Sequence, residues 1–170
     1  GGISYGLSQF STSQGSAKSF VSWLSQKYPT LGAYFEGLSP GTGAFGNAWK
    51  KCYSEHGDEF ANAQTEYTYE NMVQPWINKA KSKTGIDFSR SMALKEAAYS
   101  TAVQFGPSGL QMLKNVTSGM SDQEVITAMY DDKINNVSTY FRSSSSSVQA
   151  GVKSRFQREK QDLLDLIGKD

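Results

Sequence analysis

The stretch SMALKEAAYSTAVQF, residues 91–105, decides the fold class of this chain. Apolar and small side chains recur in it at helical spacing on nearly every side: Leu94, Ala97, Ala98, Ala102 and Val103. A helix that is apolar almost all round is buried among other elements rather than laid on a surface. The stretch therefore predicts the central helix of the fold, with small residues that let neighbouring helices approach closely.

Helical patterns continue on both sides of this stretch. Upstream, apolar residues at helical spacing predict helices over residues 16–28, 30–38, 44–56, 58–69 and 74–84, with Pro29 and Gly57 as the ends of the first and third. Downstream, Gly106-Pro107 breaks the central helix, and three helices are expected: residues 110–116, one opened by the capping box Ser121-Asp122-Gln123-Glu124, and residues 148–167. Only the first dozen residues suggest strands. The predicted fold class is mainly α with a small N-terminal β-hairpin.

Composition limits the chemistry that the chain can carry. A length of 170 residues, 38% of them hydrophobic, suits a single domain over residues 1–170. The net charge of +1 provides no global field toward nucleic acid, and no apolar run approaches the length of a membrane span. Cys52 and His56 are the only cysteine and histidine, and we interpret Cys52 as a small core residue. No phosphate loop, dinucleotide fingerprint or paired-cysteine motif occurs, so we expect no cofactor and no metal.

The start of the chain resembles a known family. Residues 1–9, GGISYGLSQ, are similar to the Gly-Gly-Val-Ser-Tyr-Gly-x-x-Gln hairpin of lysozyme-like and chitosanase-like peptidoglycan hydrolase domains of phage lysins and tail-associated muramidases. Residues 60–64, 100–107 and 146–160 are similar to further segments of that family. In order and spacing, these segments cover nearly the whole chain.

The resemblance implies a lysozyme-like α+β fold and a peptidoglycan-degrading glycosidase that cleaves cell-wall glycan strands by carboxylate acid/base catalysis. In that family the catalytic glutamate ends a helix just before the hairpin. The resemblance thus implies that this domain lacks its first helix and that the main acid precedes Gly1. It also assigns substrate binding to five polar residues: Ser4, Tyr5, Gln9, Gln64 and Gln104.

Within the chain itself, Glu66 is the candidate catalytic acid. It follows Gln64 on a predicted helix that also carries Tyr67 and Tyr69, and apolar surroundings raise the pKa of a carboxyl toward the range of a general acid. The alternative is that Glu66 is a solvated helix residue. The remaining acidic residues are explained by capping, by the helix dipole and by pairs at i,i+3 and i,i+4.

Three functional hypotheses follow. The first is the glycosidase, from a phage lysin, a phage tail or a secreted bacterial effector, acting in the virion or at the cell wall and periplasm as part of a larger protein. The second is a catalytically degenerate glycan-binding or virion structural module of the same fold, favoured by Thr65 and Phe105, where the family commonly has histidine. The third is an all-α interaction domain whose last helix packs against a partner. The residues encoded upstream of Gly1 would discriminate the enzyme from the binder.

Overall fold

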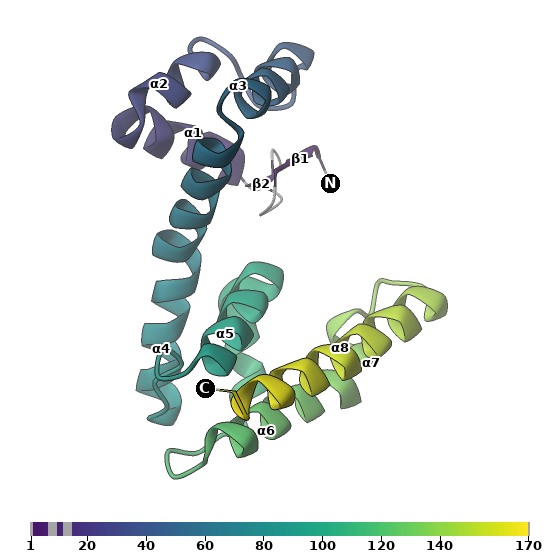
Figure 1. Cartoon of the computed structure of the whole chain (residues 1–170). Coiled ribbons are helices and arrows are strands. Elements are labelled where there is room, and N and C mark those ends of the chain that lie inside the picture. The colour runs from purple at the N-terminus through teal and green to yellow at the C-terminus, as the bar shows by residue number, and fades with distance from the viewer. Residues whose placement is uncertain (1, 7–9, 12–14, 170) are drawn as a thin grey trace. The chain divides into compact units, whose positions relative to one another are not determined.

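The computed structural model describes residues 2–6, 10–11 and 15–169. The chain divides into two compact units, Gly1–Asn71 and Met72–Asp170, and each has its own buried apolar core. Figure 1 labels the main elements of both units. Within the described residues, no helix combines the length and the apolar character that crossing a membrane requires.

The first unit joins a short hairpin to three helices. Strand β1 (Ser4–Tyr5) pairs antiparallel with β2 (Phe10–Ser11), so that Tyr5 lies opposite Phe10. The elements that follow are α1 (Ser16–Lys27), α2 (Pro29–Gly32), the 3-10 turn η1 (Ala33–Phe35), α3 (Gly43–Thr68) and the π-helical turn η2 (Tyr69–Val73). Helix α1 packs against β2, α2 and α3, as Figure 1 shows in purple and blue.

Aromatic rings fill the core of the first unit. The rings of Phe10 and Phe20 are stacked with centroids 4.4 Å apart, Trp49 meets Phe60 edge to face at 4.8 Å, and Tyr5 meets Phe45 at 4.9 Å. Buried rings contribute the largest apolar areas of any side chain, and paired rings add about 0.5–1.5 kcal/mol beyond their area. The two inward rings of the hairpin, Tyr5 and Phe10, therefore attach it to α1 and α3.

The hairpin backbone also touches α3 directly at Gly6. This residue has a φ of +71°, and a Cβ built on it would lie 2.1 Å from Gln64 Oε1 and 2.6 Å from Trp49 Cζ2. Glycine alone adopts the left-handed conformation freely and leaves room for such an approach. The glycine-rich start of the chain thus has a packing role in the fold.

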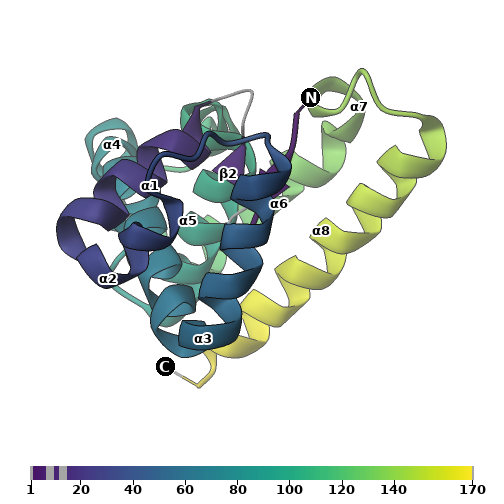
Figure 2. The ribbon, with the colours of Figure 1, turned by 90° about the horizontal axis from the view of Figure 1, so that it is seen from above.

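The second unit is entirely helical in its described residues. Its elements are α4 (Gln74–Thr84), α5 (Met92–Phe105), the 3-10 helix η3 (Gly106–Leu113), α6 (Asp122–Asn135), α7 (Val137–Tyr140) and α8 (Ser146–Ile167). Helix α5 packs against α4, η3, α6 and α8. The predicted helix is present and packs centrally in the unit, but the expected burial on nearly every side is wrong, because Met92, Lys95 and Glu96 are exposed. Its buried residues lie on one half of the helix: Ala93, Leu94, Ala97, Ala98, Thr101 and Ala102. Helix α8 lies along α6 (Figures 1 and 2).

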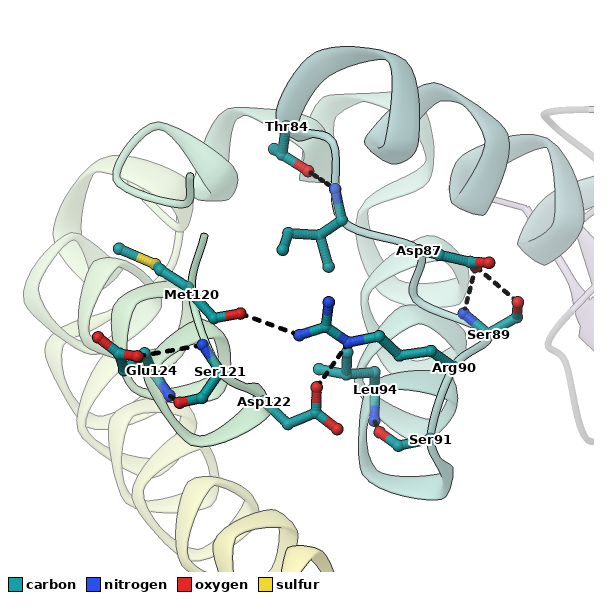
Figure 3. Close-up of polar contacts among 11 residues, drawn as sticks. Thr84, Asp87, Ser89, Arg90, Ser91, Leu94, Met120, Ser121, Asp122 and Glu124 are labelled. Carbon is teal, nitrogen blue, oxygen red and sulfur yellow. Dashed lines mark hydrogen bonds and ion pairs between the residues drawn. The ribbon is translucent and has the colours of Figure 1, made fainter. Parts of the chain in front are cut away.

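Polar contacts fasten the loop before α5 to the start of α6 (Figure 3). The Arg90 guanidinium contacts Asp122 Oδ1 at 2.7 Å and donates to the carbonyl of Met120 at 3.0 Å. The predicted capping box is confirmed, because Ser121 and Glu124 exchange both side chain to backbone hydrogen bonds at the start of α6. The capping box satisfies backbone N–H groups that the start of a helix leaves unpaired.

The coarser fold class, mainly α with a small N-terminal hairpin, is confirmed, whereas the lysozyme-like fold is not. Several boundaries differ from the prediction, and three of the differences have a clear physical reason. Pro29 begins α2 instead of only ending α1, since the first helical turn needs no N–H from proline. Residues 44–56 and 58–69 form one element, α3, kinked at His56, where φ is −135° and ψ is 40°. Gly106-Pro107 starts the 3-10 helix η3, which runs on to Leu113. That residues 1–170 form one domain stays a prediction.

A glycine pair tests the close approach at Gly6. Gly15 has nearly the same φ, +73°, but no atom lies within 4 Å of a Cβ built there. We expect Gly15→Ala to lower the free energy of unfolding by about 1 kcal/mol, the cost of a left-handed alanine. Gly6→Ala should cost about 3 kcal/mol or more, because overpacking adds to that strain. Urea denaturation of both variants would show equal losses if the hairpin did not pack on α3.

Candidate functional site

A cluster of charged and aromatic side chains surrounds Glu66 on the first unit. We call these residues the Glu66 cluster: Trp23, Lys27, Tyr28, Glu66 and Glu70. Trp23 and Lys27 lie one turn apart near the end of α1, and Tyr28 caps that helix. Glu66 is on α3 and Glu70 is on η2, four residues later. Because α1 packs against α3, the end of one helix meets an acidic edge of the other.

Glu66 is held by two donors. Lys27 Nζ forms an ion pair with Glu66 Oε1 and a second with Glu70 Oε1, at 3.2 Å. The Tyr28 hydroxyl donates to Glu66 Oε2 at 2.5 Å. The Lys27 ammonium also lies 5.4 Å from the centre of the Trp23 ring, which meets Tyr28 edge to face at 5.8 Å. The result is a surface site in which a carboxylate, an ammonium and two rings lie together.

The electrostatics of Glu66 differ from the expectation. Its hydrogen bonds from Lys27 and then from Tyr28 hold the pKa of the carboxyl below its ordinary value. The expected rise of this pKa is therefore wrong in direction, because 31% of the side chain is exposed and its charge is paired instead of being left in an apolar setting. The two hydrogen bonds favour the ionised carboxylate, which accepts hydrogen bonds. The catalytic role of Glu66 stays a prediction.

The five residues with predicted binding roles lie in different settings. Tyr5 is buried, and its hydroxyl accepts a hydrogen bond from the backbone N–H of Gly41 at 2.9 Å. Gln64 is 1% exposed and packs behind Gly6. Ser4 is exposed on β1, Gln104 is exposed on α5 of the second unit, and Gln9 lies outside the described residues. Tyr5 and Gln64 are thus packed into one core, and the substrate-binding roles of all five stay predictions.

Cys52 has the structural role that the sequence indicates. The side chain is fully buried, and burial raises the pKa of the thiol to about 12, so it is protonated at neutral pH. His56 marks the kink of α3 and lies beside the ring of Tyr34. Across the described part of the chain, no group of three or more His, Cys, Asp or Glu residues is placed to hold a metal ion.

Sequence reasoning missed Trp23 and Lys27 as members of this site. The ion pair joins residues that are 39 positions apart, and no local pattern couples them. One signal was present: Trp23 and Lys27, like Glu66 and Glu70, are spaced i,i+4, which places each pair on one face of a helix.

The paired state of Glu66 is measurable. We expect Lys27→Met to raise the pKa of the Glu66 carboxyl toward that of a free glutamate, because it removes the largest cause of the shift. NMR titration of the side-chain carboxyl carbons gives the value directly. Lys18→Met, at an exposed position on the same helix, is the matched control. Equal titration of Glu66 in the two variants would show that Lys27 does not pair with it in solution.

Comparison with known proteins relates this chain to a secretion-system spike protein. The family described as type VI secretion system spike protein VgrG3-like, C-terminal, matches residues 1–160. The type VI secretion system spike protein VgrG3 of Vibrio cholerae serotype O1 is 29% identical over 171 residues, which cover 98% of this chain and 16% of that protein. The chain therefore spans about one sixth of the length of this curated relative.

These matches overturn the assignment made from the hairpin. Identification as a lysozyme-like domain of phage lysins and tail-associated muramidases is wrong, because the family that matches is that of a secretion spike. The predicted function, a peptidoglycan-degrading glycosidase, is wrong with it, and so are its alternative of a virion module with the same fold and the virion location. The hairpin motif misled because Gly6 is explained by its packing against Gln64 and Trp49. With 160 of its 170 residues matched, the chain belongs to the family of VgrG3-like C-terminal domains of type VI secretion system spike proteins.

Proposed function

We propose that this chain is the C-terminal domain of a larger type VI secretion spike protein and travels with the spike into target cells. The observation that carries the proposal is coverage: the match takes in nearly the whole chain but only 16% of the relative. Two further features support it. Each unit has its own apolar core, and the net charge of +1 provides no strong attraction to nucleic acid.

Delivery can be tested by comparing the chain fused to a spike protein with the same chain expressed free. The chain, tagged with a small fragment of a split luciferase, is expressed in a donor with an active type VI secretion system, either fused to the C-terminal end of a spike protein or free. Recipient cells carry the complementary fragment in the periplasm. We expect light from recipients only with the fused chain and an active system. Equal signals from a donor with an inactivated system would contradict the proposal.

A second proposal concerns the ligand: peptidoglycan strands bind at the Glu66 cluster. The specific observation is that Trp23 is partly exposed and Tyr28 is 37% exposed beside an ionised carboxylate and an ammonium. Aromatic faces pack on the apolar faces of sugar rings, while charged groups bond to hydroxyl and amide groups at the edges. In this proposal the Glu66 carboxylate accepts a hydrogen bond from the bound strand. Whether Glu66 also takes part in catalysis is tested by the variant Glu66→Gln.

A binding assay distinguishes the Glu66 cluster from an exposed aromatic residue elsewhere on the first unit. We expect Trp23→Ala to reduce co-sedimentation with purified peptidoglycan, because it removes the stacking surface. Tyr53→Ala, at an aromatic residue on α3 that is 55% exposed, should bind like the wild type. Circular dichroism confirms that both variants fold. Equal binding by the two variants would exclude the cluster, and release of soluble sugar by wild type but not by Glu66→Gln would assign Glu66 to catalysis.

A further inference from the structure

A lysine is buried in the core of the second unit. Lys133 lies on α6 and has no exposed surface. Its ammonium donates a hydrogen bond to Thr101 Oγ1 at 2.7 Å, and the rings of three residues surround it, with centroids 4.2 Å (Tyr130), 5.3 Å (Phe156) and 5.8 Å (Phe105) away. Within the described residues, no carboxylate lies at ion-pair distance from it. A charge held in this way is costly, because rings and one hydroxyl replace its water.

The groups that face the ammonium come from three helices. Helix α5 supplies the Thr101 hydroxyl and the Phe105 ring, which do not titrate. Helix α6 supplies Tyr130, whose pKa burial raises, so it stays neutral. Helix α8 supplies two charges that oppose each other: the negative charge of Glu159 raises the pKa of Lys133, and the positive charge of Arg155 lowers it.

Those two charges are themselves engaged. The Glu159 carboxylate accepts a hydrogen bond from Ser100 Oγ at 2.5 Å, and the Arg155 guanidinium lies 5.6 Å from the centre of the Phe156 ring. The next acidic residue on α6, Asp132, is paired with Lys114 at 3.0 Å. Burial is therefore the largest influence on Lys133, and it lowers the pKa of the amine to about 8.

Helix α8 closes one side of this enclosure, and it buries the smallest share of its residues among the helices of the second unit. Of its 22 residues, only Phe156 and Leu163 are buried. Its polar anchors to α5 and α6 are Ser100 to Glu159 and Lys160 to Asp131, at 2.5 Å and 2.7 Å. Figure 2 shows α8 at the edge of the second unit. Displacement of α8 would remove the Phe156 ring and let water reach the ammonium, and α5 and α6 have a contact of their own.

We propose that Lys133 makes α8 an opening element: the protonated amine favours a state in which α8 moves away from α5 and α6, and loss of the proton closes it. In the open state the hydrated amine has the ordinary lysine pKa, and in the closed state its pKa is lower. The open state then binds the proton more tightly. The closed state therefore becomes more stable as pH rises above the pKa of the closed state. Below that pKa, the ratio of open to closed molecules no longer changes with pH.

Trypsin reports the opening of α8, because a helix without its packing partners is marginally stable in water and trypsin cleaves it where it unwinds. The helix carries four cleavage sites: Lys153, Arg155, Arg158 and Lys160. The rate of cleavage in α8 of the full chain is divided by that of an unfolded peptide of the same sequence at the same pH, so that the pH profile of trypsin cancels. When reclosing is faster than cleavage, this ratio follows the population of the open state.

For wild type, we expect the ratio to fall roughly 30-fold between pH 7 and pH 9.5, the change that pKa values of 10.5 open and about 8 closed produce. Lys133→Met keeps the length of the side chain without a charge, so its ratio should be low and the same at both pH values. Lys95→Met, at an exposed lysine of α5, should behave as wild type.

Two results would overturn the proposal: a wild-type ratio that does not change with pH, or the wild-type slope retained in Lys133→Met. Thr101→Val keeps the inference testable if Lys133→Met does not fold. It removes the acceptor of the ammonium at constant shape, so cleavage should be faster than in wild type at pH 7, with a smaller difference at pH 9.5. The same difference at both pH values would mean that Thr101 acts only through packing.

Discussion

Burial of aromatic rings is the constraint on which both units depend. The chain has one cysteine, so no disulfide within it can substitute for a core. In the first unit, Trp49 contacts rings from the hairpin, α1, η1 and α3. In the second, Phe105, Phe141 and Phe156 form a smaller cluster. Each unit therefore has an aromatic cluster of its own.

The sequence predicted most of the fold because the strongest signals are local. The pattern of residues 91–105 identified α5, and the box from Ser121 to Glu124 identified the start of α6. The prediction of helix boundaries failed where two local signals compete. Gly57 and Asp58 look like the end of one helix and the cap of the next, yet the apolar stripe on both sides is continuous, and one kinked helix buries it. Packing decided this boundary, and packing is not visible in a short window.

The candidate site was harder to predict than the fold. The reasoning on Glu66 used its neighbours in the sequence, Tyr67 and Tyr69, but its pKa is set by Lys27 and Tyr28 from another helix. The burial of Lys133 could have been predicted from the sequence, because it lies one helical turn after Met129 and Tyr130 on the same buried face. A lysine at such a position is usually assigned to the surface by residue type, and only the packing of α5 and α8 shows that it is enclosed.

The contact between Gly6 and α3 also affects how this family can vary in sequence. A side chain at position 6 would meet Gln64 and Trp49, so these three positions share one volume. A larger residue at position 6 becomes tolerable only when position 64 or position 49 has become smaller, and even then its left-handed backbone carries a cost. The hairpin and α3 are therefore expected to covary. At Gly6, the glycine motif at the start of the chain is explained by the shape of the contact with α3.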